Sequence, residues 1–105
     1  MASSPTQRSL KYYRDLGFTC QVVEKWNPFA KIRQDLFGFI DIIAICGGKI
    51  AGVQSTSYVN HATRKKKILE SEIAPLWLEA GGLIIISSWQ KKKNGRYEHR
   101  EEYIT

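Results

Sequence analysis

The sequence predicts an α/β or α+β fold in which a mixed sheet of about five strands is flanked by helices. Two apolar segments separated by a pair of glycines indicate a central β-hairpin, and a third apolar segment near residue 85 indicates another buried strand. Segments with helical spacing precede the hairpin and separate it from the third strand. A chain of 105 residues can bury one modest core. We therefore expect a single domain over residues 1–105.

The first helix is expected over residues 5–16. Ser4 can cap it, Pro5 suits its first turn, and apolar side chains then recur at the helical spacing. Residues 18–26 are rich in strand-forming side chains and predict a strand, which Asn27-Pro28 ends. A loop then leads toward the central hairpin.

The central hairpin is expected to consist of strands 37–46 and 49–57, joined by a two-residue turn at Gly47-Gly48. Both strands are apolar on both alternating faces, which is typical of a sheet covered by helices on both sides. Cys46 ends the first strand and is expected to be a small core residue.

The second half of the chain is expected to hold two helices, 61–71 and 75–80, followed by an apolar strand at 83–89. Asn94-Gly95 is a strong signal for a tight hairpin turn. The final strand, 96–104, carries many charges, as an exposed edge strand should.

Basic residues outnumber acidic residues by 16 to 10, which gives a net charge of +6. On a small domain this balance indicates a polyanionic partner such as DNA, although a merely basic protein without such a partner is the alternative. The basic residues cluster, and those we assign to nucleic-acid binding are Lys31, Arg33, Arg64, Lys65, Lys66, Lys67, Lys91, Lys92 and Lys93. A solvated helix face and a solubilising hairpin are the alternative explanations for the two lysine-rich runs.

The remaining titratable and aromatic residues exclude several site types. Cys20 and Cys46 form no metal-binding or disulfide pattern, so we expect a reducing, cytoplasmic setting. The chain starts without the pattern of a signal peptide, and no apolar run approaches the ~20 residues that cross a bilayer. We therefore expect no membrane partner and no small-molecule cofactor. His61 and His99 lack ligand partners and are expected at the surface, whereas both later tryptophans are expected in the core.

Asp41 interrupts an apolar segment, where an unpaired charge is costly. A two-residue turn at Gly47-Gly48 places Asp41 directly opposite Gln54 on one face of the sheet, with Thr56 one step further along. Mg²⁺ prefers oxygen ligands, which Asp41, Gln54 and the backbone carbonyl of Ser55 can supply. The alternative is that Asp41 only accepts a hydrogen bond from the Gln54 amide.

These residues resemble the PD-(D/E)XK nuclease superfamily, most closely its Holliday-junction resolvase-like and virus-type replication-repair nuclease domains. The segment 35–41 resembles the strand that bears the family's aspartate, and Val53-Gln54-Ser55-Thr56 occupies the place of its (D/E)-X-K motif. The resemblance covers nearly the whole chain, although the motif is short. It implies a restriction-endonuclease-like core with the order α-β-β-β-α-β-β.

The resemblance also implies an activity, namely Mg²⁺- or Mn²⁺-dependent hydrolysis of DNA, on branched or structured substrates, by a homodimer. Asp41 matches the metal-binding aspartate and Gln54 stands in the place of the acidic ligand, so Asp41, Gln54 and Thr56 are the expected catalytic positions. Thr56 replaces the family's lysine, and a hydroxyl cannot supply a positive charge. The family's helix-one glutamate also has no evident match.

A basic residue reaching in from elsewhere would replace the missing lysine, and the candidates are Lys31, Arg33 and Lys67. Glu24 and Asp35 could add negative charge to the site, although the sequence does not place them. Two other functions remain open. One is a nuclease-like module that binds DNA without turnover, and the other is a basic fold with a different anionic partner.

Overall fold

The computed structural model describes residues 4–105. The helices are α1 (Pro5–Asp15), α2 (His61–Leu69) and α3 (Ala74–Glu79), and a short 3-10 turn, η1 (Tyr58–Asn60), precedes α2. The strands are β1 (Thr19–Val22), β2 (Lys25–Asn27), β3 (Ile32–Gln34), β4 (Ile42–Cys46), β5 (Lys49–Ser57), β6 (Leu83–Lys91) and β7 (Tyr97–Ile104). Ser4 caps α1 as expected, because its hydroxyl accepts a hydrogen bond from the Gln7 N–H at 3.2 Å.

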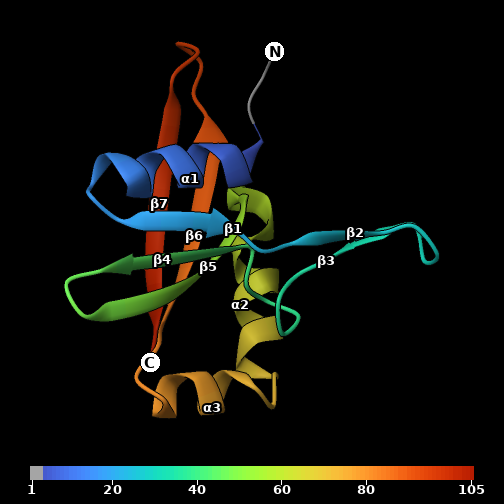
Figure 1. Cartoon of the computed structure of the whole chain (residues 1–105). Helices are drawn as coiled ribbons and strands as arrows, with labels where there is room; N and C mark the ends of the chain where they lie inside the picture. Colours follow the sequence, from blue (N-terminus) through green and yellow to red (C-terminus); the bar gives the residue numbers. More distant parts are fainter. Residues whose placement is uncertain (1–3) are drawn as a thin grey trace.

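Five strands form one mixed sheet in the order β1-β4-β5-β6-β7. Strands β5 and β6 are parallel, and the other neighbouring pairs are antiparallel. Helix α1 covers one face, while α2 and α3 lie on the other side (Figure 1). The predicted mixed sheet flanked by helices is confirmed, and β7 is an edge strand as expected.

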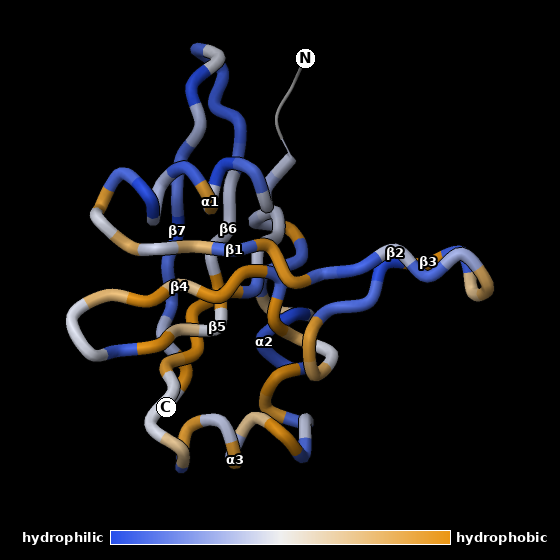
Figure 2. Tube along the Cα trace, in the orientation of Figure 1, coloured by the Kyte–Doolittle hydropathy of each residue, from blue (hydrophilic) through white to orange (hydrophobic). Residues whose placement is uncertain are grey.

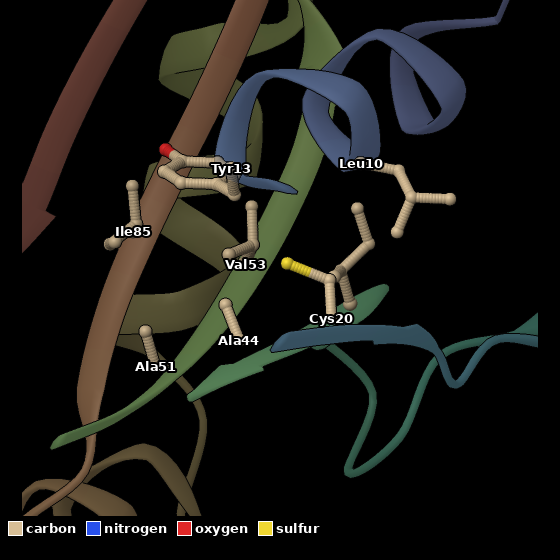
Figure 3. Packing of buried hydrophobic residues seen from close by; sticks show 8 residues of the cluster. Leu10, Tyr13, Cys20, Ala44, Ala51, Val53 and Ile85 are labelled. Carbon is tan, nitrogen blue, oxygen red and sulfur yellow. The ribbon is translucent and has the colours of Figure 1, made fainter. Parts of the chain in front are cut away.

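Two apolar cores form because alternate side chains of the central strands point to opposite faces. Ile85 packs with Tyr13 of α1 (Figure 3), whereas its neighbours Ile84 and Ile86 pack with Ile68 of α2. Strand β4 is accordingly hydrophobic along most of its length, whereas the edge strand β7 is largely hydrophilic (Figure 2). This two-sided packing fixes the register of the strands, because a slip by one residue would exchange the two faces.

The predicted hairpin at Gly47-Gly48 is confirmed. Both glycines have positive φ, +59° and +78°, as a two-residue hairpin turn requires. The register pairs Cys46 with Lys49 and Ile42 with Val53. The regular pairing ends at Ile42 and Val53, where the Asp41 N–H donates to the Val53 carbonyl at 2.8 Å. The expected pairing of Asp41 with Gln54 is therefore made by their side chains, because Gln54 Nε2 donates to Asp41 Oδ2 at 2.8 Å.

The expected strand 37–46 is wrong in its first half, because the chain turns sharply before β4. Phe37 and Gly38 both have positive φ, and a backbone bridge joins Leu36 to Ile40. The Leu36 N–H donates to the Ile40 carbonyl at 2.9 Å, which closes the turn. Glycine adopts positive φ without a steric clash, so Gly38, with φ of +83°, permits a turn where the sequence predicts an extended strand.

The expected strand 18–26 is also divided. Strand β1 pairs with β4, and the chain then leaves the sheet to form a separate two-stranded sheet from β2 and β3. The segment 27–34, expected as a loop, therefore contains the turn and second strand of a hairpin. This hairpin projects away from the body of the protein (Figure 1).

Five side chains lie in environments that differ from the prediction. Cys46 is exposed rather than in the core, because it ends β4 beside the hairpin turn. His61 is buried rather than at the surface, since it begins α2 facing the sheet, and His99 is half-buried against Trp89. Trp77 and Trp89, both expected in the core, are half-buried.

The part of the chain that the structure describes contains no helix long and apolar enough to span a membrane. The start of the chain, where we expect no signal peptide, includes residues 1–3, which lie outside the described residues.

Replacing Gly82 with alanine tests the packing of α3 on the sheet. A Cβ at this position would lie 2.3 Å from Trp77 Nε1, whose N–H donates to the Leu83 carbonyl at 2.8 Å. The indole must move and lose this bond, so we expect Gly82→Ala to lower the free energy of unfolding by about 2–4 kcal/mol. Urea denaturation measures the change, with Leu76→Ala at an exposed position of α3 as the control. Equal stability of the two variants would contradict this packing.

Candidate metal centre

Three carboxylates gather at one edge of the sheet. Glu24, Asp35 and Asp41 each direct an oxygen into a cluster in which these atoms lie within 4.8 Å of one another. Asp41 is buried, while Glu24 and Asp35 are half-buried. Ionised carboxylates repel one another at this spacing, and a bound cation would offset that repulsion.

The turn before β4 brings two of these carboxylates together. Asp35 and Asp41 lie on either side of the bridge between Leu36 and Ile40, so residues six positions apart become neighbours. The third carboxylate comes from the link between β1 and β2. There the Val23 N–H donates to the Asp41 carbonyl at 2.8 Å, which holds the adjoining Glu24 beside the cluster.

Strand β5 supplies the remaining partners of Asp41. The carboxylate oxygen Oδ2 of Asp41 accepts one hydrogen bond from Gln54 Nε2 and one from the Ser55 N–H, both at 2.8 Å. The hydrogen bond that was the alternative to a metal site is therefore present. The N–H and C=O of a strand residue face the same edge, so the Ser55 carbonyl is also directed toward this edge.

Gln54 carries a buried acceptor with no partner among the described residues. Its Nε2 donates to Asp41 and, at 3.5 Å, to Asp35, whereas its Oε1 accepts no hydrogen bond. An unsatisfied buried acceptor is uncommon. Rotating the amide by 180° would exchange the two atoms and turn Oε1 toward the carboxylates, where it could act as a fourth oxygen ligand of a cation.

Asp41 is difficult to ionise in this setting without a cation. Burial is the largest cause, and the hydrogen bond and negative charge of Asp35 add to it, so the pKa of Asp41 rises to about 8. The hydrogen bond from the Ser55 N–H lowers the pKa of Asp41 and the negative charge of Glu24 raises it, and both effects are smaller. A divalent cation among the three carboxylates would reverse this balance and favour the ionised form.

A pocket of about 670 Å³ opens over the cluster. Arg33, Arg64 and Lys67 line it together with the three carboxylates. Arg33 pairs with Glu24 at 2.9 Å, and Lys67 Nζ lies 3.8 Å from Asp35 Oδ2. The pocket thus combines three carboxylates with cationic side chains from β3 and α2. This arrangement is suited to a metal ion and a phosphate group together.

Some of the predicted site residues line the pocket and others do not. Gln54 and Ser55 line the pocket, whereas Thr56 is buried and is not among the lining residues. Of the three cations suggested to replace the missing lysine, Arg33 and Lys67 line the pocket and Lys31 does not. The structure therefore brings two of these cations to the carboxylates.

The other predicted nucleic-acid contacts lie elsewhere. Lys65 points away from the pocket and pairs with Glu102 at 2.6 Å. Lys66 is exposed on α2, and Lys91–Lys93 lie at the exposed end of the hairpin between β6 and β7, where Lys92 pairs with Glu98 at 3.7 Å.

No family model and no curated protein matches this chain. Support for a metal site therefore comes from the geometry and chemistry of these residues. The carboxylates of Glu24, Asp35 and Asp41 could hold Mg²⁺ or Mn²⁺, and the amide oxygen of Gln54 could join them only after the amide rotates, since its nitrogen now faces Asp41. Sequence reasoning left Glu24 and Asp35 unplaced, although Gly38 between the two aspartates was a signal for the turn that joins them.

A second polar cluster contains the side chains of a Ser–His–acid triad. His61 Nδ1 hydrogen-bonds Ser88 Oγ, and His61 Nε2 lies 2.8 Å from Glu102 Oε1. Both Ser88 and His61 are almost completely buried, so no substrate can reach the serine hydroxyl. This cluster anchors α2 to β6 and β7 rather than forming a catalytic site.

The raised pKa of Asp41 predicts a pH-dependent stability in the metal-free protein. An aspartate in the unfolded chain has a pKa near 3.9, so between about pH 4 and pH 8 the unfolded chain releases a proton that the folded protein keeps. The free energy of unfolding should therefore fall as pH rises through this range, by on the order of 3–5 kcal/mol from this group. Asp41→Asn should remove this contribution.

Urea denaturation in EDTA at pH 5 and pH 8.5 measures the effect, and Asp15→Asn, an exposed residue of α1, serves as the control. Parallel pH dependence of the wild type and Asp41→Asn would show that Asp41 is ionised normally.

Proposed function

We propose that this protein is a metal-dependent DNA endonuclease of the PD-(D/E)XK type, acting on branched or structured DNA. The observation that carries the proposal is the cluster of Glu24, Asp35 and Asp41 beneath a pocket lined by Arg33, Arg64 and Lys67. Metal-assisted phosphodiester hydrolysis requires carboxylates that hold a cation and, beside them, side chains that bind phosphate. The net charge of +6 supports a polyanionic substrate.

Each residue has a part in this mechanism. The three carboxylates and Gln54 would hold Mg²⁺, which when bound supplies an acidified water and offsets negative charge on the scissile phosphate. Asp41 is fixed for this purpose by the Ser55 N–H. Arg64 and Lys67 lie three residues apart on one face of α2, so both can contact the DNA backbone from the same side of the pocket.

Lys67 is the best substitute for the lysine that Thr56 replaces. Its ammonium group reaches the carboxylate cluster, whereas Thr56 is buried. A cation at this point can stabilise charge that develops on the phosphate during hydrolysis. We therefore assign Lys67, and not Thr56, the charge-stabilising role.

The finer structural proposal is that the sheet and helices form a restriction-endonuclease-like core, which the resemblance of the central hairpin supports. A homodimer also follows from that resemblance and stays a prediction. The alternative function is a nuclease-like module that binds DNA without turnover, favoured by the threonine at position 56.

Asp41→Ala tests the nuclease proposal directly. The assay measures cleavage of branched, linear duplex and single-stranded DNA by the wild type with Mg²⁺ or Mn²⁺ and with EDTA. We expect cleavage only with metal, and a loss of about 100-fold or more in Asp41→Ala, because a principal metal ligand is removed. The control is Asp15→Ala on the exposed face of α1. Failure of the wild type to cut any substrate would overturn the enzyme function in favour of the binding module.

A pair of neighbouring lysines tests the role of Lys67. Lys67→Ala should lower the rate of cleavage about 10- to 100-fold, because it removes a cation beside the reacting phosphate. Lys66→Ala removes an equal charge from an exposed position outside the pocket and should change the rate less than about threefold. Single-turnover kinetics at saturating protein separates this effect from weaker binding. Equal losses in the two variants would assign Lys67 only a general electrostatic role.

A further inference from the structure

The hairpin formed by β2 and β3, which we call the arm, is the most exposed segment of regular structure near the pocket. It pairs Lys25 with Gln34, Trp26 with Arg33 and Asn27 with Ile32. Every residue of β3 is exposed, and the arm projects from the body of the protein (Figure 1). A lone two-stranded hairpin gains little stability from its own strands, so folding alone does not account for its length.

The tip of the arm is built to present an aromatic ring to solvent. Asn27 Oδ1 accepts hydrogen bonds from the N–H groups of Phe29 and Ala30 at 3.0 and 3.1 Å, and Lys31 has a φ of +54°. This bonded turn leaves the Phe29 residue 97% exposed. Trp26, on the strand behind it, is 60% exposed. Two exposed aromatic rings on one short hairpin indicate a binding surface rather than scattered apolar residues.

The charges of the arm indicate an anionic partner. Residues 25–34 contain three cations, Lys25, Lys31 and Arg33, and no acidic residue. Lys25 and Lys31 form no ion pair with any acidic side chain among the described residues. Aromatic rings next to free cations are the combination by which proteins bind single-stranded nucleic acid.

One face of the arm continues into the pocket. Trp26 and Arg33 are cross-strand partners and therefore share a face of the hairpin. Arg33 lines the pocket and pairs with Glu24, a member of the carboxylate cluster. A strand of DNA that contacts Trp26 and Arg33 is thereby led toward the carboxylates.

We propose that the arm recognises unpaired bases in DNA, with Phe29 and Trp26 stacking on the bases and Lys25, Lys31 and Arg33 contacting phosphates. The arm then directs the adjoining strand to the pocket. This inference rests on the proposed function in so far as DNA is the partner, and it specifies that the substrate has a single-stranded segment. Fully paired DNA hides the faces of its bases, so a duplex alone cannot use the aromatic rings.

The test compares two labelled substrates, a duplex that carries a single-stranded flap and the same duplex without it. Fluorescence anisotropy in EDTA gives both dissociation constants without cleavage. We expect Phe29→Ala to weaken binding of the flap substrate about 5- to 100-fold, and binding of the duplex less than about twofold. Phe29→Tyr, which keeps an aromatic ring, should bind as the wild type does, whereas Phe29→Leu should behave like Phe29→Ala.

The matched control is Val59→Ala, which removes another highly exposed apolar side chain, 87% exposed in η1, and should leave both dissociation constants unchanged. Because Phe29 makes so few contacts with the fold, its variants should keep the thermal stability of the wild type.

Several results would overturn the proposal. Unchanged flap binding by Phe29→Ala, or equal weakening on both substrates, would show that Phe29 does not recognise unpaired bases. Sedimentation that shows a dimer broken by Phe29→Ala, with flap binding unchanged, would assign the arm to contact between two copies of the chain. Failure of the wild type to cleave DNA would overturn the nuclease function alone, because the binding comparison requires no cleavage.

Discussion

The buried carboxylate of Asp41 constrains the rest of the site. Two donors from β5 bond its oxygen Oδ2, whereas the neighbouring acids oppose its ionisation, and a cation could reach it through the pocket. Removing a charge from water without such partners would cost several kcal/mol. The local structure is therefore organised around one carboxyl group whose ionisation is unfavourable, and such groups are typical of functional sites.

The sheet makes this arrangement possible because β4 begins only at Ile42, the residue after Asp41. Beyond Val53, strand β5 continues without a β4 partner, so its backbone groups are free to bond the Asp41 side chain instead. Helix α2 packs on the face of the sheet formed by Ile84 and Ile86, and it brings Arg64 and Lys67 to the pocket. The buried His61 fixes the start of that helix through its hydrogen bonds with Ser88 and Glu102.

Helix α2 also shows why a run of basic residues does not act as one surface. Arg64 and Lys67 are three positions apart and face the carboxylates, whereas Lys65 faces β7 and pairs with Glu102. Lys66 is exposed and lies outside the pocket. Four adjacent cations are thus divided among lining the pocket, pairing with β7 and exposure to solvent, and only the helical geometry decides the place of each of them.

Local patterns in the sequence predicted the parts of this protein that depend on nearby residues. The cap at Ser4, the glycine turn at residues 47–48 and the charged edge at 97–104 follow from side-chain chemistry and backbone freedom within a few positions. The register from Cys46–Lys49 to Ile42–Val53 also follows, because a two-residue turn sets the register of both strands that it joins. Beyond this ladder only the side chains of Asp41 and Gln54 meet.

The tertiary structure alone decided which distant groups meet. Glu24 and Asp35 join Asp41 only because the chain leaves the sheet after β1, forms the arm, and turns again at Gly38. His61 and Cys46 were misplaced for the same reason, since burial depends on what packs against a residue and not on its neighbours in sequence. The sequence by itself thus determined the central hairpin and its buried carboxyl group, and packing between separate elements determined the cluster of carboxylates around that group.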